Sequence, residues 1–347
     1  MKEANEQHRK RQKEAPELIR LINNGAMSQA ACVAAELGIA DLLVDGPKRA
    51  DELARVTSCH EPSMHRLLRA LTALEICMEQ HDGSFALGPL GALLRSNTPN
   101  SLRSWTIWCG KHMWPISGDL LHSVKTGETA RQRVGGIDRF GLLENDPTAA
   151  AVFNSAMAEL SRFVANEVLS SYQFGGVRRI VDVGGGYGAL LAALLKGHRE
   201  LHGVLLDLPQ AVEGARTHMT NAGLADRCEI VAGDFFDSIP NGADVYLLKA
   251  VLHDWGDEKS IAILRNCRRA IARNGKLLLI ERIVPERFEA CTLHHAIAWA
   301  DLTMLVEFGG RERTEAEFRS LLEATGFKLT KVTPTSLGFC LLEGIPC

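Results

Sequence analysis

The sequence predicts an α/β fold, with a doubly wound, Rossmann-like parallel sheet in its second part and a mainly helical domain before it. Three observations predict this fold. From about residue 178 onward, short apolar strands alternate with helices, as in a parallel sheet covered by helices on both faces. Residues 180–189 run from β-branched residues directly into a glycine-rich turn. The first hundred residues lack this alternation, and we therefore expect them to form a separate domain.

The first hundred residues predict helices and one hairpin in the order of a winged helix. A charged helical arm and an Ala/Leu-rich helix come first, and a helix-turn-helix and a hairpin follow. In chain order these elements occupy residues 3–17, 26–43, 50–55 with 64–74, and 78–87. The hairpin has Asp82-Gly83 at its centre, a dipeptide typical of two-residue hairpin loops.

A winged helix in isolation suggests binding to DNA, and the charge of this chain argues against that function. The second helix of the helix-turn-helix carries only Arg66, Arg69 and His65 as basic residues, and the whole chain has a net charge of −3. A domain that reads DNA displays a basic stripe. The alternative function is that of a cofactor-sensing regulator that binds DNA. Binding to duplex DNA that weakens steeply with salt would support this alternative.

The second part predicts five parallel strands, helices between them and a closing pair of strands. The parallel strands occupy about 178–184, 202–208, 228–234, 243–251 and 276–284. The helices include 190–196, 257–273, 291–305 and 314–326, and the closing strands are 327–333 and 338–342. Pro209 ends the second strand and opens the next helix, while Asn274-Gly275 ends a helix.

The glycine turn after the first strand predicts a nucleotide-shaped site. Gly184, Gly186 and Gly188 have no Cβ, so the backbone can approach a ligand closely. In open α/β sheets such a turn lies at the carboxyl end of a strand, where ligands bind. The spacing from Gly184 to Ala189 also suits an NAD or FAD fingerprint, so the turn by itself leaves the ligand open.

Polar residues at the ends of the other strands narrow the range of ligands that this site could bind. Asp207 and Asp234 end the second and third strands, Lys249 and His253 lie at and beyond the fourth, and Glu281 lies toward the end of the fifth. Because parallel strands end at one edge of the sheet, these five groups are expected to gather there.

Their chemistry favours S-adenosylmethionine over NAD. Asp207 is placed to take the two hydroxyls of a ribose. Asp234 suits the exocyclic amine of adenine, and Phe235 suits its ring face, although Phe235 fits ordinary core packing equally well. Lys249 offers a cation for a carboxylate. An adenosine joined to a carboxylate, with no demand for a pyrophosphate clamp, describes S-adenosylmethionine.

His253 is the candidate general base. A phenol has a pKa of about 10, so only roughly one molecule in a thousand is ionised at pH 7. Histidine titrates near neutrality and suits removal of that proton. Glu281 and Glu312 suit the orientation of its ring and the stabilisation of an imidazolium. Asp254 has two alternative roles at this stage, as the cap of the following helix or as a contact of the catalytic site.

The order of motifs resembles the caffeate/acetylserotonin-type O-methyltransferases of plant and microbial specialised metabolism. These motifs are 181–188 (Val-Asp-Val-Gly-Gly-Gly-Tyr-Gly), 206–209 (Leu-Asp-Leu-Pro), 233–236 (Gly-Asp-Phe-Phe), 253–255 (His-Asp-Trp) and 309–314 (Gly-Gly-Arg-Glu-Arg-Thr). The resemblance covers nearly the whole chain. It implies a class I methyltransferase fold, S-adenosylmethionine as cosubstrate with S-adenosylhomocysteine as product, and a homodimer.

The resemblance also implies roles for individual residues and domains. The implied catalytic residues are His253, Glu281 and Glu312, and the implied cofactor contacts are Gly184, Gly186, Asp207, Leu208, Asp234, Phe235 and Lys249. Residues 1–100 become a winged-helix-like dimerisation domain and residues 101–347 the methyltransferase domain. Within the latter, 101–175 supplies connecting helices that contribute to the acceptor pocket.

Several aromatic and flexible side chains are candidates for binding a flat acceptor. Trp105, Trp108 and His112 share one face of a helix, where packing between domains is the alternative. Phe153, Asn154 and Met157 resemble the family's segment that reaches the acceptor. We expect Asp254, Met304 and Phe308 to line the same pocket, with core packing as the alternative for Met304 and Phe308.

Composition limits the remaining possibilities. The chain has 347 residues, 46% of them hydrophobic, which suffices for two cored domains. Nine cysteines without Cys-x-x-Cys spacing indicate reduced thiols and a cytoplasmic protein. No apolar run is long enough to span a bilayer, and no signal peptide is evident. We expect no metal, because the adjacent His294 and His295 point about 100° apart on a helix.

The sequence therefore predicts a cytoplasmic, homodimeric enzyme that methylates a hydroxyl of an aromatic small molecule such as a polyketide, a phenazine or a phenylpropanoid, as in antibiotic biosynthesis. The alternative within the same fold is methylation of a ring nitrogen. A nitrogen that already bears a lone pair would not need His253.

Overall fold

The computed structural model describes residues 2–96 and 98–347, with side chains described from residue 14 onward. The chain divides into two compact units, residues 1–112 and residues 113–347.

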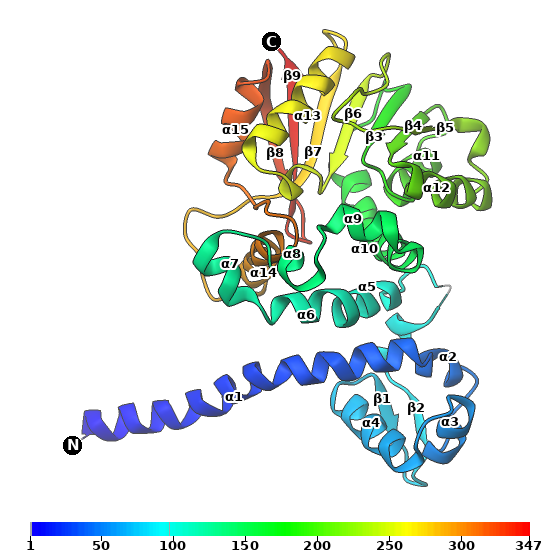
Figure 1. Cartoon of the computed structure of the whole chain (residues 1–347), viewed down its shortest axis with the longest axis vertical. Coiled ribbons are helices and arrows are strands. Elements are labelled where there is room, and N and C mark those ends of the chain that lie inside the picture. Colours follow the sequence, from blue (N-terminus) through cyan, green and yellow to red (C-terminus); the bar gives the residue numbers. More distant parts are fainter. Residues whose placement is uncertain (1, 97) are drawn as a thin grey trace. The chain divides into compact units, whose positions relative to one another are not determined.

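The first unit consists of helices around one small hairpin (Figure 1). Its elements are α1 (Lys2–Glu36), α2 (Ile39–Leu42), α3 (Ala50–Val56), α4 (Glu61–Ala73), β1 (Cys77–Glu79), β2 (Phe85–Leu87), η1 (Gly91–Leu94) and α5 (Arg103–Trp108). Strands β1 and β2 pair in antiparallel orientation, as the turn dipeptide Asp82-Gly83 predicts. Apolar residues of the helices, including Leu53, Leu68 and Leu71, form its core with Phe85 of the hairpin.

Helix α1 differs from the two helices expected from the sequence, because one helix runs without a break from the charged arm into the Ala/Leu-rich segment. Pro16 lies inside it, where a proline removes one N–H donor. The residues after Pro16 lack a second helix breaker until Gly25, and a single glycine inside a helix costs only about 1 kcal/mol. The side chains of residues 3–13 of the predicted arm lie outside the described part.

A series of helices opens the second unit and leads to the sheet. A π-helical turn, η2 (Cys109–Met113), contains the boundary between the two units. The helices of the second unit are α6 (Trp114–Ser117), α7 (Leu120–Thr126), α8 (Ala130–Gly135), α9 (Arg139–Asn145) and the long α10 (Pro147–Ser171). Asp146 is the N-cap of α10, and its side chain accepts hydrogen bonds from the N–H groups of Thr148 and Ala149, as expected for an aspartate at this position.

The second unit contains a seven-stranded sheet with the order β5-β4-β3-β6-β7-β9-β8 (Figure 1). The strands are β3 (Arg179–Val183), β4 (His202–Asp207), β5 (Cys228–Ala232), β6 (Val245–Lys249), β7 (Lys276–Arg282), β8 (Phe327–Pro334) and β9 (Phe339–Pro346). Strands β3 to β7 are parallel, whereas β9 runs antiparallel to β7 and to β8. This is the predicted doubly wound class I methyltransferase fold with a closing pair of strands.

Apolar clusters lie on both faces of the sheet. One joins β3, β4 and β6 to α10, α11 (Ala189–Gly197) and α12 (Pro209–Asn221). The other joins alternate residues of the same strands to α13 (Asp257–Ala270) and α15 (Glu315–Glu323). Burial on both faces explains the nearly continuous apolar runs that mark these strands in the sequence.

The order of the strands brings the carboxyl ends of β3, β4, β6 and β7 to one edge. Strand β3 lies between β4 and β6, so the chain leaves it at a topological switch point of the sheet. The remaining helix, α14 (Thr292–Glu307), follows β7. Among the described residues, no helix has the length and apolar character needed to cross a membrane.

Candidate active site

The glycine turn after β3 has the backbone conformation that requires glycine. Gly184, Gly186 and Gly188 have φ angles of 71°, 58° and 75°, in the left-handed region that L side chains rarely adopt. The N–H of Gly184 donates to the carbonyl of Leu206 at 2.8 Å, which ties the turn to β4. A Cβ at Gly184 would lie 3.6 Å from the ring of Phe235, so this turn and Phe235 are close neighbours.

Asp207, at the end of β4, faces the glycine turn. Its Oδ2 accepts a hydrogen bond from the N–H of Gly186 at 2.6 Å, and its Oδ1 accepts one from the N–H of Leu208 at 2.7 Å. Burial raises the pKa of Asp207, while these two hydrogen bonds oppose that rise. Because each carboxylate oxygen has two lone pairs, both oxygens retain capacity for a ligand hydroxyl.

The loop after β5 holds Asp234 and two phenylalanines. Asp234 Oδ1 accepts a hydrogen bond from the N–H of Phe236 at 2.8 Å. Asn266 Nδ2 donates to the carbonyls of Phe235 and Phe236 at 2.8 and 2.7 Å, which fixes the loop against α13. The ring of Phe235 makes a T-shaped contact with that of Trp255 at a centroid distance of 6.3 Å.

Lys249 and Asp182 supply opposite charges beneath this edge. Burial, together with the neighbouring guanidinium of Arg282, lowers the pKa of Lys249 to about 8, against the attraction of Asp182. Burial likewise raises the pKa of Asp182 to about 7. Lys249 is therefore still mostly cationic at pH 7, as a partner for a carboxylate must be.

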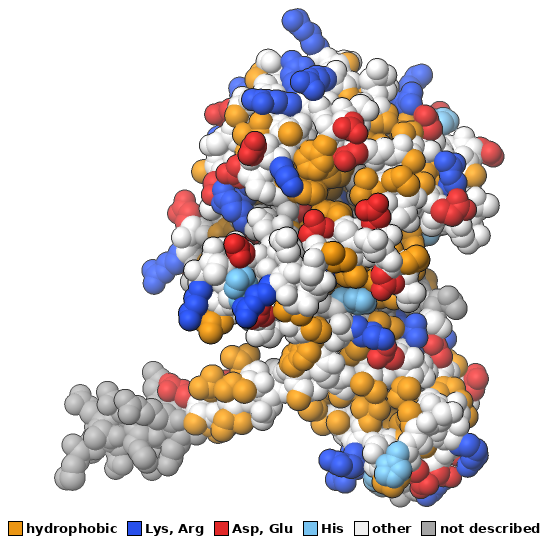
Figure 2. All heavy atoms as spheres, viewed as in Figure 1, with side chains coloured by type: hydrophobic (Ala, Val, Ile, Leu, Met, Phe, Trp, Pro, Cys, Tyr) orange, Lys and Arg blue, Asp and Glu red, His pale blue; other side chains and the backbone are white. Residues whose placement is uncertain are grey.

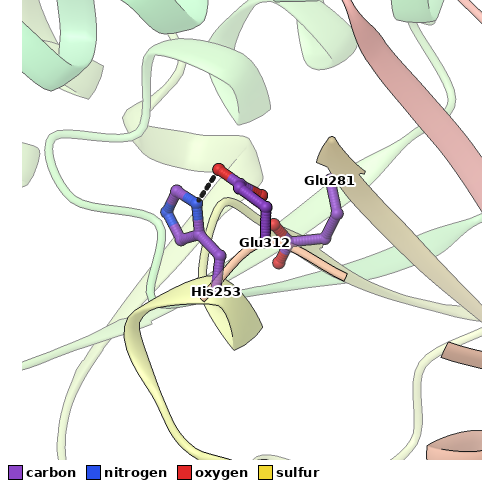
Figure 3. A group of neighbouring side chains, drawn as sticks. All are labelled: His253, Glu281 and Glu312. Carbon is purple, nitrogen blue, oxygen red and sulfur yellow. Dashed lines mark hydrogen bonds and ion pairs between the residues drawn. The ribbon is translucent and has the colours of Figure 1, made fainter. Parts of the chain in front are cut away.

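His253 lies in the short turn η4 (Leu252–Asp254) that follows β6, and Figure 3 shows it with two glutamates. Its Nδ1 is 3.0 Å from Oε1 of Glu312. Glu281, on β7, accepts hydrogen bonds at Oε1 from the N–H groups of Val251 and Leu252, at 3.0 and 2.9 Å. Thus Glu312 orients the imidazole ring, and Glu281 holds the backbone of the turn.

Carboxylates on both sides of His253 favour its protonated form. Burial alone would lower the pKa of His253, but the attraction of Glu312 and Asp254 outweighs burial and raises this pKa to about 9. Asp254 Oδ1 lies 3.5 Å from Nε2 of the ring. Asp254 does not cap α13, because the N-cap of that helix is Gly256.

The segment 309–314 holds the same turn by its backbone, a support that the sequence analysis missed. The N–H of Arg311 donates to the carbonyl of His253 at 2.9 Å. The fully buried Arg313 donates from Nη1 to the carbonyl of Leu252 at 2.8 Å and from Nη2 to the carbonyl of Trp255 at 2.7 Å. In the sequence, these arginines are visible only as part of the motif 309–314, which also contains Glu312. Their partners lie more than 50 residues earlier in the chain, so their role follows only from the fold.

A buried arginine, Arg139 on α9, lies among the predicted acceptor residues and also escaped the sequence analysis. Its guanidinium carbon lies 4.7 Å from the ring centroid of Phe153 and 4.6 Å from that of Phe308. Its Nη2 pairs with Glu307 at 2.6 Å, and Glu307 also pairs with the buried Arg131. The structure therefore brings Phe153 and Phe308 together around one guanidinium.

The other predicted acceptor residues are distributed over both units. Asn154 is buried on α10, and its Oδ1 lies 4.0 Å from the place of a Cβ at Gly186, next to the glycine turn. Met157 is partly buried on α10 and Met304 is buried on α14. The remaining three, Trp105, Trp108 and His112, belong to the first unit, where Trp108 stacks on His112 at a centroid distance of 4.3 Å.

His253, Glu281 and Glu312 also bring three potential metal-ligand atoms within 4.8 Å of one another. In the structure, Oε1 of Glu312 already bonds His253, and Oε1 of Glu281 already accepts two backbone N–H groups. These bonds are the ones needed to orient a histidine base. His294 is used structurally, because its Nδ1 accepts a hydrogen bond from the N–H of Glu289 at 2.8 Å.

Comparison with family models identifies both parts of the chain. Residues 118–328 match the model of the O-methyltransferase domain, and residues 19–97 match that of the O-methyltransferase dimerisation domain.

Known proteins resemble the chain over nearly its whole length. A phenazine O-methyltransferase of Lysobacter antibioticus is 43% identical over 329 residues, which cover 95% of each protein. The solved structure of a mitomycin 7-O-methyltransferase has a TM-score of 0.89 at 37% identity and covers 98% of this chain and all of that one. A third structure is that of an O-methyltransferase of neocarzinostatin biosynthesis, solved with S-adenosylmethionine and 2-hydroxy-5-methyl naphthoic acid. It has a TM-score of 0.78 at 33% identity, and the match covers 93% of this chain and 96% of that one.

Proposed function

Because this chain belongs to the O-methyltransferase family and carries that family's dimerisation domain, we propose that it methylates a hydroxyl of an aromatic small molecule, with S-adenosylmethionine as the methyl donor and His253 as the general base. The observation that carries this proposal is the buried His253–Glu312 pair, with 3.0 Å between Nδ1 and Oε1. It lies beyond the end of β6, next to the strand whose glycine turn suits a nucleoside.

The residues of the sheet edge fit S-adenosylmethionine. The donor supplies a methyl group bound to a positively charged sulfur. Asp207 takes the ribose hydroxyls with the oxygens that already bridge Gly186 and Leu208. Gly184 leaves space beside the ring of Phe235, which is placed to pack on the adenine.

Two charged side chains complete this donor site. Asp234 is held in place through its bond to the N–H of Phe236 and is placed to meet the exocyclic amine of adenine. Lys249, mostly cationic at pH 7 with its pKa near 8, provides the partner for the donor's carboxylate.

The acceptor side combines aromatic, polar and sulfur-containing side chains. Phe153, Phe308 and Asp254 lie around the guanidinium of Arg139, the first two by ring contacts and Asp254 by charge. Rings of this kind suit a flat aromatic acceptor. The relatives named above act on a phenazine and on mitomycin or bind a naphthoic acid, and we propose the same broad class, hydroxylated aromatic metabolites, for this chain. Further acceptor contacts are proposed for Trp105, Trp108, His112, Asn154, Met157 and Met304.

In the proposed mechanism, neutral His253 takes the hydroxyl proton at Nε2 as the oxygen attacks. Glu312 holds the ring through Nδ1, and it stabilises the imidazolium that forms. General-base catalysis contributes about 10²–10⁴-fold. Alignment of the two bound reactants contributes more, roughly 7–11 kcal/mol of the barrier, so the positioning of acceptor and donor dominates the rate.

In this proposal, the first domain joins two copies of the chain into a homodimer. On α1, the apolar side chains of Leu18, Ile19, Leu21 and Ile22 are more than half exposed, and Figure 2 shows apolar side chains gathered on this helix. Residues 1–100 are proposed as the dimerisation domain and residues 101–347 as the catalytic domain, with 101–175 contributing to the acceptor pocket. No disulfide joins the cysteines in the described part of the chain, which supports a cytoplasmic location.

The proposal is tested by mass spectrometry of methyl transfer. Purified protein and S-adenosylmethionine are incubated with catechols, polycyclic phenols and hydroxyphenazines, beside the His253→Ala variant. We expect products one methylene heavier, and a loss of at least about a hundredfold in the variant. Products that persist in His253→Ala would instead indicate N-methylation or an acceptor that is already ionised.

A further inference from the structure

The proton-accepting nitrogen of His253 has a carboxylate partner that the general-base role does not require. Nδ1 is satisfied by Glu312 at 3.0 Å. On the opposite side of the ring, Nε2 lies 3.5 Å from Oδ1 of Asp254. A histidine with a carboxylate beside each ring nitrogen binds two protons, because only the imidazolium donates from both.

From this geometry, which rests on the proposed function of His253, we propose that Asp254 is a positioning residue that holds a proton on Nε2 until the acceptor hydroxyl takes its place. The distance of 3.5 Å is that of an ion pair and leaves this partner replaceable. The Glu312 contact is shorter, and it keeps the ring fixed while the partner at Nε2 changes.

The charges around this pair agree with a proton that can move between them. Around the ring, Glu312 comes from the segment after α14, Glu281 from β7 and Asp254 from the same turn. Burial raises the pKa of Asp254 to about 7, while His253 and Arg139 of α9 oppose the rise. The carboxyl of Asp254 can therefore hold a proton near neutral pH, which an exposed aspartate cannot.

Two further cations limit the negative charge of this group. Arg282 Nη1 lies 3.9 Å from Oε1 of Glu312, and Lys249 of β6 interacts with Asp254. With Arg139, three cationic side chains interact with the three carboxylates that surround His253.

When His253 becomes a base, the Nε2 proton passes by way of a carboxylate oxygen of Asp254 to solvent, which leaves a lone pair on Nε2 and Asp254 ionised again. The hydroxyl proton then moves to Nε2, and a bond from oxygen to the methyl carbon replaces the bond from sulfur to that carbon. Asp254 thus sets the pH at which His253 becomes a base, without itself contacting the reacting methyl group.

The test is an NMR titration of His253 in the acceptor-free protein, with the imidazole signals assigned by their loss in His253→Ala. In Asp254→Asn, which keeps the side-chain shape, we expect the midpoint of His253 to fall by about one pH unit or more. In Asp257→Asn we expect no change, because the carboxylate of Asp257 pairs with Arg313 and Arg311. This control removes a carboxylate from the same region of the chain while Asp254, Glu281 and Glu312, the carboxylates around His253, stay in place.

An unchanged midpoint in Asp254→Asn would overturn the inference. The acid limb of kcat/KM provides a second measurement, since it reports the free enzyme and should move with the NMR midpoint in Asp254→Asn. If Asp254 had only a structural role, Asp254→Asn would lower kcat/KM at every pH and would leave the pH midpoint of its acid limb unchanged. Failure of the proposed function is distinguishable, because it appears as undiminished methyl transfer by His253→Ala whatever the NMR midpoint.

Discussion

The substitution Gly310→Ala tests whether the catalytic turn is held by direct backbone contact. A Cβ at Gly310 would lie 2.0 Å from the carbonyl oxygen of His253 and 2.5 Å from the carbonyl carbon of Asp254. Real Cβ atoms essentially never approach closer than 3.0 Å. The turn that carries His253 must therefore retreat by about 1 Å, and a displacement of this size at a catalytic group costs on the order of a hundredfold in rate.

This loss corresponds to about 2.7 kcal/mol of transition-state stabilisation. The assay is steady-state methyl transfer with saturating S-adenosylmethionine, together with calorimetric binding of S-adenosylmethionine and thermal unfolding. We expect kcat to fall about a hundredfold, while donor binding, which uses other loops, stays within a few-fold of wild type. Gly256→Ala is the matched control, because a Cβ there meets nothing within 4 Å and its φ of −63° suits alanine. A Gly310→Ala variant that keeps the kcat of Gly256→Ala would refute this account of the turn.

Three other predictions follow from individual groups. The pKa of His253 is raised to about 9, so the ring is mostly imidazolium below that pH and cannot accept a proton. The value of kcat/KM should therefore rise roughly tenfold per pH unit from pH 7 toward pH 9. A flat pH profile over this range would contradict a histidine base. Asp207→Asn should weaken binding of S-adenosylmethionine by about 10–100-fold in calorimetry, because one charged acceptor is lost, and unchanged affinity would remove Asp207 from the donor site. Glu307→Gln removes the carboxylate that the buried Arg131 and Arg139 share. The free energy of unfolding should fall by about 3–5 kcal/mol, and the melting temperature should fall by roughly 10 °C. An unchanged melting temperature would show that this group of three charges does not stabilise the fold.

The sheet and its ligand edge were predictable because both follow from local patterns. The apolar runs predicted strands β3 to β7, and the order of the strands placed Asp207, Lys249 and His253 at one edge. Pro209 opens α12 as expected. The residue types at the strand ends are the basis on which a nucleoside site and a proton acceptor are predicted.

The supports of the site could not be predicted in the same way. Arg139 and Glu307 are 168 residues apart in the chain, and their pairing depends on how α9 and α14 pack in the second unit. Likewise, Gly310 and Arg313 act on the backbone of a turn more than 50 residues earlier. The continuity of α1 through Pro16 also escaped prediction, because a charged arm and an apolar helix differ in composition even where the backbone is unbroken.

The predicted acceptor residues belong to both compact units. Phe153 and Phe308 meet at one guanidinium, whereas Trp105 and His112 belong to the other compact unit. Their common role in acceptor binding therefore stays a prediction, to be tested by substitution of each with a known acceptor in hand.

A single-turnover measurement of methyl transfer by wild type and His253→Ala, at saturating S-adenosylmethionine, tests the central claim most directly. It isolates the chemical step from product release. If His253 removes the hydroxyl proton, the single-turnover rate should fall at least about a hundredfold in the variant, with donor affinity unchanged. A variant with the wild-type rate would contradict the claim that this histidine is the general base of an aromatic O-methyltransferase.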